Sequence, residues 1–153
     1  MITYVGYGFD TNDIDDEIWY NLTKKYDTKE VDDHLKDSFD YEMTEDKVIS
    51  EEDKITDALN FIDENSMSRC EYLRNIINSE ESKKAGTDYI VTSYDNFLVF
   101  DSIRFADDSK RTEYIRNRND FINMIKRYIP VDNIKFGNLY EGNDWIDPNY
   151  FIE

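Results

Sequence analysis

Carboxylates are the side chains of this sequence whose spacing points most directly to chemistry. Five of them lie close together near the start of the chain: Asp10, Asp13, Asp15, Asp16 and Glu17. Such a run is typical of a calcium loop or of a magnesium-dependent enzyme. A calcium loop does not fit, because Ile14 stands at the fifth position, where an oxygen ligand is needed, and Asp15 replaces the turn glycine at the sixth. We therefore favour an acid-rich helix N-terminus without a metal, and keep a metal-dependent enzyme as an alternative.

Other reactive side chains are scarce. The chain has one histidine, His34, and one cysteine, Cys70, and no motif pairs the two. Glycine-rich phosphate loops of the GxGxxG or GxxxxGK[ST] type do not occur. Cys70 lies in an apolar helical pattern, which is typical of a small buried residue, and a lone cysteine fits a reducing compartment. These features predict no catalytic residue, no cofactor and no enzyme activity.

Two segments with helical periodicity carry acids on one side and apolar residues on the other. At about 100° per residue, four acids of residues 27–40 fall within roughly a quarter of the helix circumference. In residues 50–64 three acids and Asn60 form a narrow stripe opposite the apolar side chains. The predicted partner-binding surface consists of seven of these acids: Glu30, Asp33, Asp37, Asp40, Asp53, Asp57 and Glu64. At 1.5 Å per residue, Asp53 and Asp57 lie ~6 Å apart, a distance comparable with that between successive nucleic-acid phosphates.

The charge of the whole chain supports a basic partner. The formal net charge is −17, and residues 1–64 hold 20 acids against 6 lysines, a balance of −14. Such a field attracts basic proteins and repels free nucleic acid and anionic membranes. The basic residues cluster later in the chain: Arg104, Lys110, Arg111, Arg116, Arg118, Lys126 and Arg127. Because residues 101–135 contain 8 bases and 6 acids, we expect this cluster to pair with the acidic helices or to mediate self-association.

In size, composition and the charge pattern of residues 10–64, the chain resembles the acidic DNA-mimic inhibitors of phages and mobile elements, the anti-CRISPR and antirestriction proteins. This resemblance implies a non-enzymatic inhibitor that mimics the nucleic-acid backbone and blocks the basic substrate channel of a Cas effector or restriction nuclease. The chain is also similar to acidic immunity proteins, which implies an antitoxin that neutralises a basic nuclease toxin. A neutral alternative is an adaptor or structural phage protein that binds through its aromatic C-terminal residues, Tyr140, Trp145, Tyr150 and Phe151.

The first half of the chain predicts one strand and four helices. Met1–Phe9 is expected as a strand, in which Gly6 and Gly8 mark bulges. A first helix ends near Tyr26, and a second begins near Asp27, which has capping-box spacing to Glu30. Ser50 and the Ser68–Glu71 capping box are expected to begin the third and fourth helices.

The second half changes to a period of two. Tyr89–Tyr94 and Phe97–Phe105 are expected to form a hairpin around Asp95-Asn96, with Phe97–Phe100 as a central strand. A third strand over Lys110–Arg116 and a helix beginning at residue 117 or 119 follow. Ile134–Phe136 is expected as an edge strand.

Together these elements predict an α+β fold in a single domain of residues 1–153. Acidic amphipathic helices, within residues 1–86, pack on a small antiparallel sheet formed mainly by the C-terminal half, residues 87–153. No apolar run reaches the ~20 residues that a membrane span needs, and Met1–Phe9 lacks the regions of a signal peptide. The abundance of Asn, Ile, Lys, Asp and Tyr is typical of an AT-rich genome. We therefore expect a protein of the bacterial cytoplasm.

Overall fold

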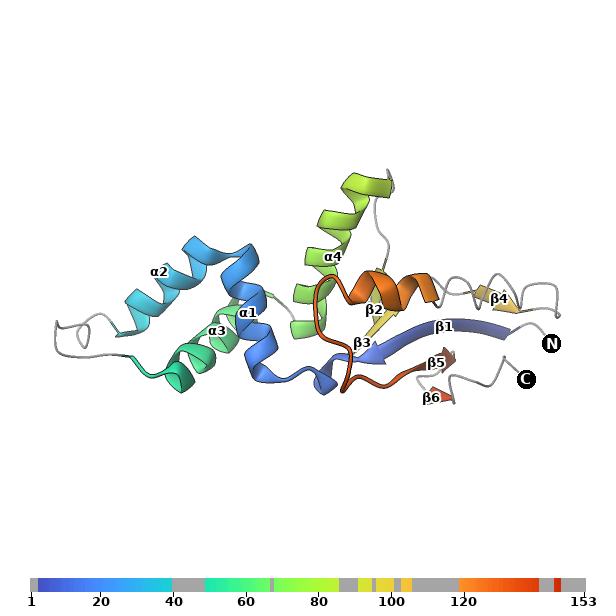
Figure 1. The fold of residues 1–153 in the computed structure, drawn as a ribbon, viewed down its shortest axis with the longest axis horizontal. Helices are drawn as coiled ribbons and strands as arrows, with labels where there is room; N and C mark the ends of the chain where they lie inside the picture. The colour runs from blue at the N-terminus through green and yellow to red at the C-terminus, as the bar shows by residue number, and fades with distance from the viewer. Residues whose placement is uncertain are drawn as a thin grey trace.

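The computed structural model has an α+β fold and describes residues 3–39, 49–66, 68–85, 91–94, 96–100, 103–105, 119–140 and 145–146. Figure 1 shows an elongated arrangement, with α1, α2 and α3 at one end and the strands at the other. Helix α4 stands between these two groups. The predicted strand over Lys110–Arg116 lies outside the described residues.

The sheet is antiparallel and is centred on the N-terminal strand. Its strands are β1 (Thr3–Asp10), β2 (Val91–Tyr94), β3 (Phe97–Phe100), β4 (Ile103–Phe105), β5 (Phe136–Tyr140) and β6 (Trp145–Ile146). The strand order is β2-β3-β1-β5-β6, and β4 pairs with the first residues of β1. The expectation that the sheet comes mainly from the C-terminal half is therefore wrong, because β1 is the strand that joins its two sides. The edge strand predicted over Ile134–Phe136 begins only at Phe136, as β5, and is not an edge, because β5 lies between β1 and β6.

The hairpin predicted around Asp95-Asn96 is confirmed. Strands β2 and β3 pair antiparallel, and Tyr94 lies opposite Phe97. Leu98 and Val99 point to opposite faces of β3, yet both are buried, as expected for a strand that is covered on both sides.

Gly8 permits a close approach of two strands rather than a bulge. The pairing of β1 with β5 runs without interruption from Val5 to Phe9, so the predicted bulges at the two glycines of this strand are wrong. On the other side, Gly8 lies opposite Val99 of β3. A Cβ atom at Gly8 would lie 2.1 Å from the backbone oxygen of Leu98, which no side chain can tolerate.

The helices begin close to the predicted signals. After the 3-10 turn η1 (Thr11–Asp13) come α1 (Asp16–Tyr26), α2 (Thr28–Phe39), α3 (Glu51–Asn65) and α4 (Arg69–Ala85), and residues 119–125 are also helical. The hydroxyl of Ser50 accepts from the backbone amide of Asp53, and that of Ser68 accepts from the amide of Glu71, each at 3.1 Å. Both predicted caps are thus confirmed.

Helix α4 connects the helical end to the sheet. It packs on α3 on the side of the helical end, and on β2 and β3 on the side of the sheet. Its side chains Leu73 and Ile77 are fully buried, as are Trp19 of α1 and Phe9 of β1, and all belong to one hydrophobic cluster. Phe121 of the helix over residues 119–125 joins this cluster and meets the ring of Phe9 at 6.2 Å. None of the helices within the described residues is long and apolar enough to cross a membrane.

Candidate acidic binding surface

Helices α2 and α3, which carry six of the seven predicted contact acids, pack against each other. Glu30, Asp37 and Asp53 are exposed and form no ion pair within the described part of the chain. Asp33 is exposed as well, but Lys29 lies 3.2 Å from its carboxylate one turn away. Asp40 lies outside the described residues. Three of the predicted acids are therefore exposed and form no ion pair with another described residue.

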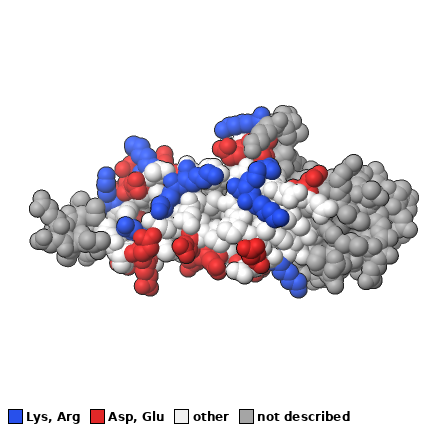
Figure 2. Space-filling view, viewed as in Figure 1, with Lys and Arg blue, Asp and Glu red and all other residues white. Residues whose placement is uncertain are grey.

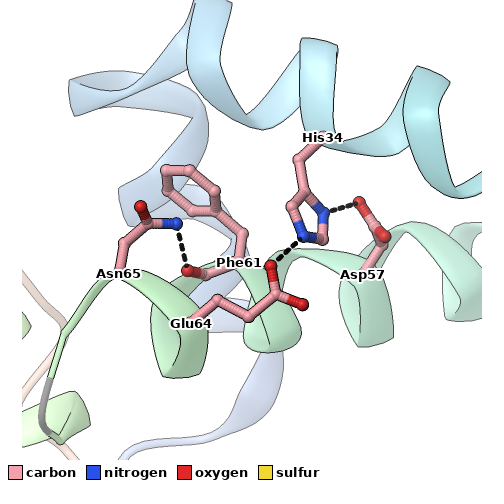
Figure 3. Close-up of polar contacts among 5 residues, drawn as sticks. All are labelled: His34, Asp57, Phe61, Glu64 and Asn65. Carbon is pink, nitrogen blue, oxygen red and sulfur yellow. Dashed lines mark hydrogen bonds and ion pairs between the residues drawn. The ribbon is translucent and has the colours of Figure 1, made fainter.

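The other two acids, Asp57 and Glu64, hold a histidine between them. Figure 3 shows His34 of α2 pointing at α3, where Nδ1 lies 2.9 Å from Asp57 and Nε2 lies 2.8 Å from Glu64. The ring of Phe61 packs beside the imidazole, with 5.8 Å between the ring centres. We call His34, Asp57 and Glu64 the histidine clamp. Asp57 is only 4% exposed, so it is not available as a surface charge in this structure.

The clamp favours the protonated imidazole. Burial of His34 lowers its pKa, but the hydrogen bonds and the negative charges of Asp57 and Glu64 outweigh burial and raise the pKa above its usual value. Both ring nitrogens can donate only when the ring is charged. The clamp is therefore a charged link between two acidic helices. The positive charge of His34 also neutralises part of the negative charge predicted for this surface.

A second group of acids lies at the beginnings of two helices. We call them the first-turn acids: Asp16, Glu17, Glu51, Glu52 and Asp53, all of which are exposed. Figure 2 shows acidic side chains along one edge of the molecule, beneath α3 and the start of α1, while lysines and arginines lie mainly along the opposite edge. Sequence reasoning considered the acids of α1 as partners of the helix dipole or as ligands of a metal-dependent enzyme, and did not select Glu51 or Glu52 as contact residues.

Contacts between α1, α3 and α4 fix the position of this acidic edge. Arg69 of α4 lies 3.7 Å from Asp16 and 3.4 Å from Asp63, so it joins the start of α1 to the end of α3. The negative charges of α2 and α3 also act on α1. Burial first, and then the charges of Glu51 and Asp32, raise the pKa of Tyr20. Because α1 also packs directly on α3, the acids of both helices belong to one rigid framework.

The basic residues are described only in part. Arg127 forms an ion pair with Glu81 of α4, which is 4% exposed, and Lys126 beside it is exposed. This ion pair joins Arg127 to α4 and not to α2 or α3, so the expected pairing of the cluster with the two acidic helices stays a prediction. The side chains of the other five basic residues of the cluster and of the aromatic residues from Tyr140 onward lie outside the described part.

The groups considered for enzyme chemistry do not converge. Asp10 accepts from the backbone amide of Asn12 at 2.9 Å, and Asp16 pairs with Arg69. Burial raises the pKa of Cys70 to about 12, which keeps its thiol protonated. Across the described residues, no three His, Cys, Asp or Glu side chains are arranged to hold a metal ion. Comparisons of the chain with protein-family models, curated proteins and solved structures found no match.

Proposed function

We propose that this protein is a non-enzymatic inhibitor that occupies the basic nucleic-acid channel of a Cas effector or restriction nuclease. It does so by presenting carboxylates where the channel normally holds phosphates. The observation that carries this proposal is the set of exposed acids held on packed helices, namely the first-turn acids together with Glu30 and Asp37. A basic nuclease toxin is the alternative partner, and the protein would then act as its antitoxin.

A rigid framework is what distinguishes this surface from an acidic tail. Helices α1 and α3 pack on each other, and the first turn of α3 is held by the Ser50 cap. Carboxylates in a first turn also interact favourably with the helix dipole, which offsets part of their mutual repulsion. The helices therefore hold these acids in place without a partner. Preorganised charges lose little freedom on binding.

The histidine clamp changes which of the seven predicted acids contact the partner. Glu30, Asp37 and Asp53 keep that proposed role, because each is exposed and free of an ion pair within the described residues. Asp57 and Glu64 are assigned to holding α2 on α3. Asp33 is a weaker contact, since Lys29 already neutralises part of its charge.

The test is an affinity capture from bacterial lysate at two salt concentrations. A partner held by many ion pairs releases counterions when it dissociates, so a basic nuclease should bind at about 0.1 M salt and elute at about 0.5 M. Glu51→Gln/Glu52→Gln should weaken capture. The matched control is Asp120→Asn/Asp132→Asn, which removes two exposed charges elsewhere. Capture that resists salt, or that falls equally in both variants, would contradict the proposal.

A separate experiment addresses the antitoxin alternative. Rescue of cells from a single co-expressed nuclease toxin would identify the protein as its antitoxin.

A further inference from the structure

Three carboxylates and three aromatic rings line a groove where all four α-helices meet. We call it the corner groove; its volume is about 450 Å³, and the lining residues used here are Tyr26, Asp27, Glu30, Phe61, Tyr72 and Glu80. That volume lies within the range of small-ligand sites. None of the described lysines or arginines is among its lining residues. The groove is therefore negative and aromatic at once.

Its inner wall combines apolar surface with a fixed hydrogen bond. Phe61 and Tyr72 are 8% and 7% exposed. The hydroxyl of Tyr72 donates to the carboxylate of Asp27. Burial first, and then the bond to Asp27 and the charges of Asp27 and Glu30, raise the pKa of Tyr72, so the phenol stays a donor. Because a carboxylate has about four acceptor positions, Asp27 keeps the capacity to accept from a ligand.

Two further carboxylates stand around the groove. Glu30 is exposed and has no ion pair within the described residues. Glu80 is half-buried and lies 3.9 Å from Lys83, whose side chain is 70% exposed. An exposed ion pair of this length contributes little to stability, so a bound cation can replace Lys83 as the partner of Glu80. The groove thus offers two carboxylates that a bound cation can recruit in addition to Asp27.

The arrangement of carboxylates selects among cations. A guanidinium is planar and donates to carboxylates in pairs, whereas an ammonium group is more strongly hydrated and bonds as a point charge. The aromatic rings add little stacking surface, because Phe61 and Tyr72 are almost fully buried, and Tyr128 and Lys25 already contact the ring of Tyr26. The selection therefore rests on the three carboxylates of the groove, which suit the paired donation of arginine better than lysine.

We propose that the corner groove binds one arginine side chain of a basic partner protein. This proposal adds one specific contact to the proposed function. It rests on that function only for the source of the arginine, because nucleic-acid channels contain arginine side chains that contact phosphates. Glu30 then belongs both to the exposed acids and to the groove. The bound arginine would fix the register of the partner on the helical end of the molecule.

The test titrates the full chain with N-acetyl-arginine amide alone and follows backbone amide signals by NMR. Signals of groove residues such as Asn65, Asn75 and Ser79 should shift and saturate with arginine. N-acetyl-lysine amide should bind more weakly. N-acetyl-citrulline amide, which has nearly the same shape without the charge, should leave the signals unchanged.

Two matched variants locate the effect. Glu30→Gln should weaken binding roughly three- to fivefold, the size expected for one exposed charge contact. Asp132→Asn removes an exposed charge outside both the groove and the proposed contact surface and should change nothing. Equal shifts with citrulline, shifts spread over all acidic residues, or unchanged binding by Glu30→Gln would each overturn the proposal. Since no partner is present, such a result would leave the salt-dependent capture as a separate test of the proposed function.

Discussion

The imidazole of His34 lies 2.9 Å from the carboxylate of Asp57, which is buried where α2 meets α3. This contact joins two helices, each of which the sequence predicts to present its acids to a partner. Asp57, one of the predicted contact acids, instead contacts the neighbouring helix. The charge that remains outside is therefore smaller, and includes the first-turn acids together with Glu30 and Asp37.

The stability of the protein should depend on pH through the histidine clamp. The pKa of His34 is raised in the folded state, so its contribution is fully present below about pH 6.5, the usual pKa of unfolded histidine. It is lost as the pH rises through the higher folded pKa. Urea unfolding between pH 5.5 and 8.5 should therefore show a free energy of unfolding that falls toward high pH.

The chain contains no other histidine, so His34→Gln is a direct control for this titration. The variant should lose about 1–2 kcal/mol at pH 6, as expected for hydrogen bonds to a charged group, and much less at pH 8.5. Its unfolding should be nearly independent of pH in this range. A wild-type slope that survives in the variant would show that another group titrates.

Removing the buried carboxylate should be more damaging than removing the exposed one. Asp57→Ala leaves the charged imidazole without its buried partner, and breaking such a pair costs about 3–5 kcal/mol. Glu64→Gln should cost about 0–1 kcal/mol, because the Glu64 side chain is 64% exposed. Equilibrium unfolding at pH 6 measures both, with Asp53→Asn as the exposed control on the same helix. Similar losses for Asp57→Ala and Asp53→Asn would contradict the buried contact.

Gly8→Ala should destabilise the sheet. Its methyl group would meet the backbone oxygen of Leu98 at 2.1 Å, so β1 and β3 would have to separate. Strain of this kind exceeds the loss of about 1–3 kcal/mol typical of overpacked cores. The expected result is a large drop in the melting temperature or failure to fold. Melting of Gly8→Ala at the wild-type temperature would show that the strands are farther apart than described.

Cys70 should be unreactive until the protein unfolds. It is 1% exposed, and burial raises its pKa to about 12, so very little thiolate exists at pH 8. Ellman's reagent should therefore label the native protein far more slowly than the protein in denaturant. Because the chain has no second thiol, the rate would also report opening of α4. Rapid labelling under native conditions would rule out the buried position.

Local signals predicted much of the fold because they act through neighbouring residues. Ser50 and Ser68 were identifiable as caps since a hydroxyl and an unpaired amide three residues later suffice to define one. The hairpin around Asp95-Asn96 followed from the turn chemistry alone. The class of fold and most helix boundaries could therefore be predicted without long-range information.

Features that depend on distant partners could not be predicted. Nothing near Gly8 signals that residues 98 and 137 flank it, so the position was interpreted as a bulge. The helical periodicity of α3 places Asp57 opposite the apolar side, but gives no information on a neighbouring helix. The one available signal was His34, a lone histidine beside the apolar face of α2 among many acids. The proposed partner surface rests on exposure and charge, and its binding role stays a prediction.

The central position of β1 has a consequence for synthesis. This strand emerges from the ribosome before its partners β3 and β5, which begin at Phe97 and Phe136. During translation its exposed edges have no strand to pair with until more than half of the chain has been made. Helices α1 to α4 lie in that interval and can form from local contacts first. The sheet is therefore completed by closing the longest loops of the chain, and β1 is the segment that depends most on protection from aggregation while it waits.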